Sequence, residues 1–328
     1  MEGETALTEK KTFAIGVDVG GTTIKAGIVD RQGKILEQVS FDTKADKGPR
    51  VVMNQIVLTI GQLLESQKKA SCLGIGVGIP GMVTPDDGMV RYPPNFADWE
   101  EVPVASNLRK VFALPIFIEN DANAAAMGEA KAGAGKSFRD FLFVIWGSGV
   151  GGGIILDHKI YRGPHGGAGE IGHVSIDYEG LLCNCGSKGC IEAYIGQRYL
   201  SKRTKEILQN APKDAYPSKI YDLVGGNLNK IEPAIISRAA EDGDPTAISI
   251  LKEAGELLGY GLASALNILD LRIVVIGGGI SAVPSFVYTA IQDGLRSRVL
   301  KSHKTGVRVL KAELGNTAGI IGAATLAM

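Results

Sequence analysis

A histidine and three cysteines lie close together near the middle of this sequence, in a stretch that a glutamate closes at each end. The stretch runs from Glu170 to Glu192, and its four candidate ligands are His173, Cys183, Cys185 and Cys190. Three thiolates and an imidazole form a complete tetrahedral set for Zn²⁺ in a closed structural site. Two glycines between the cysteines permit the tight turns of a chain that wraps a metal. We therefore predict a zinc site; a buried histidine with unpaired thiols, or a disulfide, is the alternative.

Two glycine-rich turns between strand-like segments are candidates for anion binding. The first spans residues 18–22 (DVGGT) and the second residues 146–151 (WGSGVG). Backbone N–H groups in such turns form a concave anion site, because no side chains keep phosphate oxygens away. Two such turns, each at the tip of a hairpin and facing each other, would hold a polyphosphate from both sides. Asp18 could then bind a hydrated Mg²⁺. A third glycine run, residues 277–279, would let a nucleotide base or ribose approach. Simple tight hairpins are the alternative.

Dinucleotide binding of the Rossmann type is excluded at both places where G-x-G-x-x-G occurs. The matches begin at Gly147 and at Gly76. That fingerprint requires a helix directly after the turn, so that its N-terminus can hold the pyrophosphate. The first match continues into a strand-like run and the second into a loop. The sequence also lacks the G-x₄-G-K-[ST] pattern of a P-loop.

A carboxylate lies between a buried strand and an alanine-rich helix, in the run Glu119-Asn120-Asp121. Strand-to-helix junctions at the carboxyl edge of a sheet commonly carry the chemistry of α/β proteins. In phosphoryl transfer to an alcohol, such a carboxylate accepts the hydroxyl proton. The alternative is that Asp121 only caps the helix, a role that contributes about 1 kcal/mol.

The composition is that of an ordinary soluble protein of two domains. The chain has 328 residues, with 35 Lys plus Arg and 35 Asp plus Glu, so no net field attracts nucleic acid or a membrane surface. Four cysteines, three of them clustered, fit a reducing compartment, and Cys72 is interpreted as a core residue. The first residues are polar and resemble no signal peptide. We expect a cytoplasmic protein.

Hydrophobic periodicity predicts two similar halves. Each half begins with a strand, a glycine turn and a second strand, at residues 13–30 and 141–161. Each then continues into helices and buried strands, which indicates a duplicated α/β fold with a cleft between the halves. The further predictions are a strand at 34–41, a helix at 50–69, strands at 73–81 and 115–121, a helix at 122–133, a helix at 246–269, a strand at 272–280, a helix at 285–299, a strand at 307–314 and a closing amphipathic helix at 317–328.

Taken together, these motifs resemble the ROK family of sugar kinases, within the actin/hexokinase-like ATPase superfamily. The resemblance extends from DVGGTTIKAG (18–27) to RIVVIGGG (272–279), and EIGHVSID…CNCGSKGCIEAY is its most specific part, with GIPG and ENDANAAAMGE in agreement. It implies a two-domain actin-like, ribonuclease H-like ATPase fold with an interdomain cleft. The expected small domain is residues 1–119 with the helix 315–328, and the large domain is residues 120–314.

The resemblance also implies roles for individual residues. Asp121 would be the catalytic base that accepts the proton of the sugar 6-hydroxyl. The residues expected to bind the sugar, together with Asp121, are Gly81, Asn95, Asn120, Glu170, His173 and Glu192. Those expected around ATP and Mg²⁺ are Asp18, Gly20, Gly21, Thr22, Thr23, Lys25, Ser148, Gly149, Gly278 and Gly279. The zinc would be a scaffold, because four protein ligands leave no open position on the metal.

The expected activity is that of an ATP-dependent hexose kinase, most simply a glucokinase. N-acetylglucosamine, N-acetylmannosamine, mannose and fructose are alternative substrates. A sugar-binding regulator or an actin-like ATPase without kinase turnover is the alternative of another class. Repressors of the family add an N-terminal helix-turn-helix, whereas only about a dozen polar residues precede the first strand here. Family members are commonly dimers or tetramers, so we expect a homo-oligomer.

Overall fold

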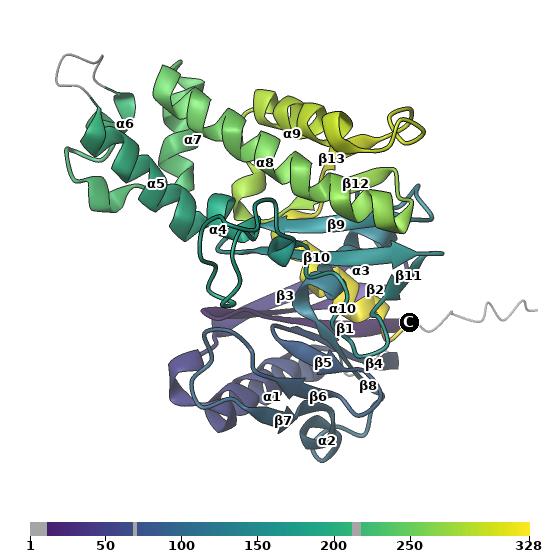
Figure 1. Ribbon diagram of the computed structural model, residues 1–328. Helices are drawn as coiled ribbons and strands as arrows, with labels where there is room; N and C mark the ends of the chain where they lie inside the picture. Colours follow the sequence, from purple (N-terminus) through teal and green to yellow (C-terminus); the bar gives the residue numbers. More distant parts are fainter. Residues whose placement is uncertain (1–11, 68–70, 212–217) are drawn as a thin grey trace, which may run out of the picture. The chain divides into compact units, whose positions relative to one another are not determined.

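The computed structural model describes residues 12–67, 71–211 and 218–328 (Figure 1). By compactness the chain divides into two units. The first contains the chain up to Lys136 together with Arg162–Ala168 and Asn316–Met328, and the second contains Ser137–Tyr161 and Gly169–Gly315. The helix that follows residue 120 therefore belongs to the first unit. The domain boundaries expected from the sequence stay a prediction.

The first unit is built on a mixed five-stranded sheet in the order β3-β2-β1-β4-β8. Its strands are β1 (Thr12–Val19), β2 (Thr23–Asp30), β3 (Ile35–Asp42), β4 (Ser71–Ile79) and β8 (Ile116–Asn120). The first three form an antiparallel meander, and β4 and β8 add in parallel beside β1. A small antiparallel sheet follows β4 and consists of β5 (Met82–Thr84), β6 (Met89–Arg91) and β7 (Glu101–Pro103).

The second unit repeats this arrangement in a sheet of the order β11-β10-β9-β12-β13. Its strands are β9 (Phe141–Trp146), β10 (Val150–Leu156), β11 (Lys159–Tyr161), β12 (Ile273–Gly277) and β13 (Arg308–Lys311). Again the first three are antiparallel and the last two add in parallel beside the first. The predicted duplicated α/β fold is confirmed, because both sheets have the same order and the same directions.

Helices cover both faces of the first sheet. The helix α1 (Pro49–Ser66) packs against β1, β2 and β3 through a buried apolar stripe. The helices α3 (Asp121–Ala132) and α10 (Ala318–Thr325) pack against each other, and α10 also packs on β1 and β4. Glycine makes that approach possible, because a Cβ at Gly16 would overlap the Ile320 carbonyl and one at Gly76 would overlap the Ala323 carbonyl.

The predicted amphipathic character of the last helix is wrong. All residues of α10 from Ala318 to Ala324 are buried, so the helix has no polar face. Its sequence AGIIGAAT consists of small and apolar residues apart from the final threonine. Such a helix is stable because it lies inside the unit, and helices that are apolar all round are typically buried.

Two long helices, α8 (Pro245–Leu269) and α9 (Ser285–Arg298), lie side by side in the second unit (Figure 1). The remaining elements are the helices α2 (Val104–Arg109), α4 (Glu192–Ile195), α5 (Gln197–Asn210), α6 (Lys219–Leu223) and α7 (Pro233–Glu241), and the 3₁₀ turns η1 (Ala45–Lys47), η2 (Ile171–His173), η3 (Leu228–Lys230), η4 (Gly279–Ser281) and η5 (Gly315–Thr317). Among the described residues, none of the helices has the length and apolar character that crossing a membrane requires.

Candidate active site

The first glycine turn is the tip of the β1–β2 hairpin. The N–H of Gly20 donates to the carbonyl of Thr23 at 2.9 Å, so this amide closes the turn and does not point outward. Among the described residues, nothing lies within 4 Å of a Cβ built at Gly21, so the backbone there faces open space. The tip is therefore a narrow turn with room for a ligand beside its second glycine.

Thr43 holds this tip in place, and the sequence analysis did not single it out. Its hydroxyl donates to the Gly20 carbonyl at 2.6 Å, and its N–H donates to the Thr22 carbonyl at 2.9 Å. The side chain is completely buried. A threonine just beyond the end of β3 has no local sequence pattern that would reveal this contact, since Gly20 lies 23 positions earlier in the chain.

Asp18 lies at the base of the same tip and pairs in register with Lys25 across the hairpin. Burial raises the pKa of its carboxyl from 3.8 to about 6; the negative charge of Asp121 also raises this pKa, while Lys25 lowers it. A Cβ at Gly319 would lie 2.6 Å from the carboxyl carbon, so α10 comes close to this side chain. The structure thus brings Asp18, Lys25 and Asp121 together within the first unit.

Asn120 caps α3, and the sequence-based suggestion that Asp121 is the N-cap is wrong. The side-chain oxygen of Asn120 accepts from the N–H groups of Ala122 and Asn123, as an N-cap residue does. Its amide nitrogen donates to the carbonyl of Gly81 at 3.1 Å, which joins two of the predicted sugar-binding residues. Asp121 is the first residue of the helix, and its Oδ1 accepts from the N–H of Ala122 at 2.9 Å.

The second glycine turn joins β9 to β10 and lies beside the end of β12. Gly278 has a φ of +89°, and a Cβ there would lie 2.5 Å from the carbonyl oxygen of Trp146. Only glycine fits so close to another backbone. The tip with Ser148 and Gly149 and the run Gly278–Gly279 are therefore neighbours within the second unit, as the predicted nucleotide site requires.

Glu192 connects this second tip to the cysteine loop. Its Oε2 accepts the N–H of Val150 at 2.9 Å, and its Oε1 lies 3.9 Å from the sulfur of Cys183. The residue begins α4, two positions after Cys190. One carboxylate thus fixes the start of β10 relative to the cysteines.

The four predicted zinc ligands come together in the structure. One ligand atom from each of His173, Cys183, Cys185 and Cys190 lies within 4.8 Å of all the others. The sulfurs of Cys185 and Cys190 are 3.7 Å apart, and Cys183 Sγ is 3.8 Å from His173 Nδ1. A tetrahedral Zn²⁺ with bonds of about 2.3 Å to sulfur separates two sulfurs by about 3.8 Å. The side chains therefore fit a tetrahedral zinc ion, and no disulfide links these free cysteines.

The thiols of this cluster differ in acidity. The backbone N–H of Ser187 lowers the pKa of the exposed Cys185 to about 7. Burial raises the pKa of Cys190 to about 12, and burial also raises that of Cys183. Metal ligation requires thiolates, so binding of Zn²⁺ would release protons from the two buried thiols.

Glu170 and Asn95 complete the predicted sugar-binding set. Glu170 directly precedes η2, and one of its carboxylate oxygens lies 4.0 Å from His173 Nε2. The Nδ1 of His173 is near the cysteines, so its two ring nitrogens have different neighbours. Asn95 is exposed and adopts a left-handed φ of +67°. The predicted residues thus fall into two groups: the first unit holds Asp18, the first tip, Lys25, Gly81, Asn95, Asn120 and Asp121, and the second unit holds the others.

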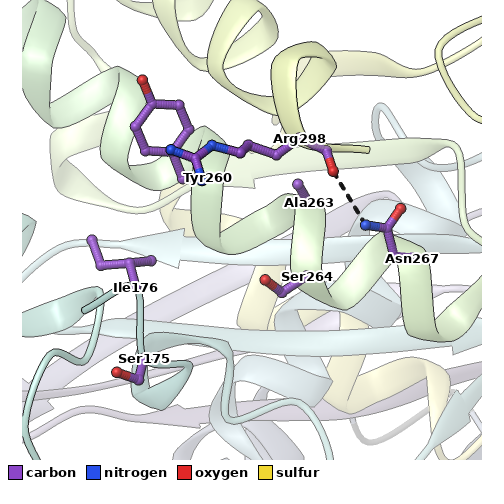
Figure 2. Close-up of a pocket in the computed structure, with 7 residues that line it drawn as sticks. All are labelled: Ser175, Ile176, Tyr260, Ala263, Ser264, Asn267 and Arg298. Atoms are coloured by element: carbon purple, nitrogen blue, oxygen red, sulfur yellow. Dashed lines mark hydrogen bonds between the residues drawn. The ribbon is translucent and has the colours of Figure 1, made fainter. Parts of the chain in front are cut away.

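A further cavity of about 230 Å³ lies in the second unit, between the cysteine loop and α8 (Figure 2). Ser175 and Ile176 line it from the cysteine loop, and α8 contributes residues between Tyr260 and Asn267. The guanidinium of Arg298 lies over the Tyr260 ring, 4.5 Å from its centre, and Figure 2 shows the two side chains next to each other. None of the predicted site residues lines this cavity.

Comparison with known proteins identifies the class of protein that this fold and these residues define. A family model described as the ROK family matches residues 14–328, nearly the whole chain. The chain belongs to the ROK family, and its two repeated sheets are those of an actin-like ATPase fold.

Particular relatives carry more specific names. A glucokinase from Thermotoga maritima is 33% identical over 316 residues, which cover 96% of this chain and 97% of the relative. The solved structure of a ROK family glucokinase from Streptomyces griseus, in complex with glucose and AMPPNP, is 35% identical, with a TM-score of 0.81 and coverage of 96% and 98%. A xylose repressor from Caldicellulosiruptor bescii is 29% identical and covers 94% of this chain but 76% of the repressor.

Proposed function

We propose that this protein is an ATP-dependent hexose kinase that converts glucose to glucose 6-phosphate. The observation that carries the proposal is the arrangement at the head of α3. There Asp121 lies in the first helical position while Asn120 provides the cap, so the aspartate is not needed as the cap. The glucokinase relatives named above support glucose as the substrate.

In the proposed reaction Asp121 accepts the proton of the sugar 6-hydroxyl. The hydroxyl oxygen forms a bond to the γ-phosphorus, and the bond from that phosphorus to the β–γ bridging oxygen breaks, which releases ADP. Catalysis of this kind rests mainly on positioning and on neutralising the phosphate charges. Mg²⁺ on the nucleotide would supply charge neutralisation, and Asp18 is the residue we assign to its hydration shell. The two glycine tips and the run Gly278–Gly279 would hold the nucleotide.

The remaining predicted residues would recognise the sugar. Fixed acceptors and donors such as Glu170, His173 and Asn95 suit the ring hydroxyls of a hexose. The zinc would have a structural role, since the Cys₃His set leaves no open coordination position. It would bind Nδ1 of His173 and so orient the imidazole with Nε2 toward the sugar. Groups that do not touch a ligand commonly orient the residues that do. We also propose a cytoplasmic homo-oligomer.

A sugar-responsive regulator is the second candidate, and the similarity to a xylose repressor favours it. The two candidates differ in turnover. A regulator would bind a sugar without releasing ADP, whereas a kinase releases one ADP for each sugar phosphate formed.

The test is a panel of sugars with ATP and a coupled assay for ADP. The panel contains glucose, mannose, fructose, N-acetylglucosamine, N-acetylmannosamine and xylose. We expect the highest kcat/KM with glucose, and ³¹P NMR should identify the product as the 6-phosphate. Sugar binding without ADP release would support the regulator instead.

A further inference from the structure

The chain segment Arg162–Ala168 belongs to the first unit, although the chain on both sides of it belongs to the second. It is a closed loop, because the N–H of Ala168 donates to the carbonyl of Arg162 at 3.0 Å. Gly166 has a φ of +80°, and a Cβ there would lie 2.5 Å from the carbonyl oxygen of Val83 in β5. The loop therefore lies tightly against the small sheet that follows β4.

One ion pair fastens the loop to β8. The Nε of Arg162 donates to Glu119 Oε2 at 2.6 Å, and the glutamate side chain is 2% exposed. The other oxygen, Oε1, accepts the N–H of Asn120 and the side-chain amide of Asn123, both at 3.0 Å. Removal of the cation from a buried ion pair leaves an uncompensated charge, which strongly destabilises the folded protein. Glu119 thus depends on Arg162 for its place at the end of β8.

We propose that Arg162 is a positioning residue for the phosphoryl acceptor. Its partner Glu119 lies in β8, two residues before Asp121. The ion pair therefore fixes the end of the strand that leads directly into the first residue of α3, Asp121. Arg162 itself opens the loop that leads along the chain to Glu170 and His173. The pair therefore joins the loop Arg162–Ala168 to Glu119 near the end of β8, directly before Asn120 and Asp121. This inference rests on the proposed function, because it concerns the same hexose site.

A double-mutant cycle tests the proposal in the full-length protein. The variants are Arg162→Met, Glu119→Gln and the double variant, with Arg139→Met as control, because Arg139 forms a comparable 2.9 Å pair with Asp157 on the surface. We expect each single variant to lower kcat/KM for glucose about 10- to 100-fold, the cost of a small misplacement of reacting groups. The KM for ATP should stay within about twofold.

The double variant separates positioning from general damage. It leaves no buried charge without a partner, so its loss should be smaller than the product of the two single losses. Arg162→Lys, which keeps a cation, should recover part of the activity. Kinetics like those of the Arg139→Met control, or equal changes in the KM for glucose and for ATP, would overturn the proposal.

Hydrogen exchange separates a failure of this inference from a failure of the proposed function. If the wild-type protein phosphorylates no hexose, the proposed kinase activity is refuted. The role of the ion pair is then tested by hydrogen exchange alone. Arg162→Met should speed exchange at the amides of Ala168 and Asn120, which are hydrogen-bonded through the loop base and through Glu119. Unchanged exchange at both amides contradicts the proposed positioning role.

Discussion

Asp121 begins α3 beside an asparagine that performs the capping, and this division of roles leads to a direct prediction. Asp121→Asn should lower kcat about 10²- to 10⁴-fold, the usual contribution of a general base. The affinity for glucose should change little, since an amide can still form hydrogen bonds with a hydroxyl group. The coupled assay gives kcat and calorimetric titration gives Kd. Asp86→Asn, an exposed position in the same unit, is the control, and a kcat near the wild-type value in Asp121→Asn contradicts the assignment.

Asp18 should make stability depend on pH in the absence of nucleotide and Mg²⁺. Its pKa in the folded protein is about 6 against an ordinary 3.8, mainly because of burial. The folded state therefore binds the proton more tightly, so this contribution to stability is full below about pH 4 and is lost as the pH rises through 6. The side chain of Asp18→Asn does not titrate, so this variant lacks the pH-dependent loss. Its free energy of unfolding, relative to that of the wild type, should rise by up to about 3 kcal/mol between pH 4 and pH 7. Urea unfolding at several pH values measures this, and a difference that does not vary with pH would refute it.

At the scale of elements, the packing of α10 on the first sheet depends on glycines. Gly76→Ala should lower the free energy of unfolding by about 1–3 kcal/mol or more, because its Cβ would overlap a backbone carbonyl that cannot move alone. Gly61→Ala is the matched control. Gly61 lies within α1, where a Cβ meets nothing within 4 Å among the described residues, so alanine should stabilise the protein by about 0.4–1 kcal/mol. Thermal and urea unfolding measure both, and equal effects would contradict the packing.

The cysteine loop is the second element that can be tested separately. Elemental analysis should find about one Zn²⁺ per chain, as four protein ligands form one closed site. Cys185→Ala should lose the metal and weaken glucose binding, because the imidazole of His173 is then no longer held. Cys72→Ala is the control, since that thiol lies in β4 and contacts the Gly74 carbonyl. Glucose affinity that survives loss of the metal would show that zinc does not organise the sugar site.

At the scale of the whole molecule, local patterns predicted most strands of the two large sheets and the helices α1, α3, α8, α9 and α10. They did not predict the small sheet β5–β7, the helices α5 and α7, or the long-range contacts. The repeated strand–turn–strand pattern was enough to predict the duplicated sheets, because alternation and glycine turns are local signals. The contact of Thr43 with Gly20 and the pair of Arg162 with Glu119 join residues 23 and 43 positions apart. No periodicity encodes such contacts. The pattern of the last helix predicts a polar face, which its small, buried residues do not provide.

The cysteine cluster could be predicted because its chemistry is local. His173 and Cys190 lie close in the chain, and the ligand types alone point to zinc. The N-cap of α3 was harder to predict from the sequence, because Asn120 and Asp121 are both residue types that favour this position. Only the backbone geometry distinguishes them. Sequence alone therefore predicted candidate reactive groups and missed Thr43 and Arg162, whose contacts lie far along the chain.

The most direct test of the account is a crystal structure of the protein with glucose and a non-hydrolysable ATP analogue. We predict that the Asp121 carboxylate lies about 2.6–3.2 Å from the sugar 6-hydroxyl, the distance of a base from its proton donor. The same sugar should contact the ring of His173, and the γ-phosphate should lie next to the 6-hydroxyl. A hexose bound away from Asp121, or a nucleotide bound away from both glycine tips, would contradict the central claim.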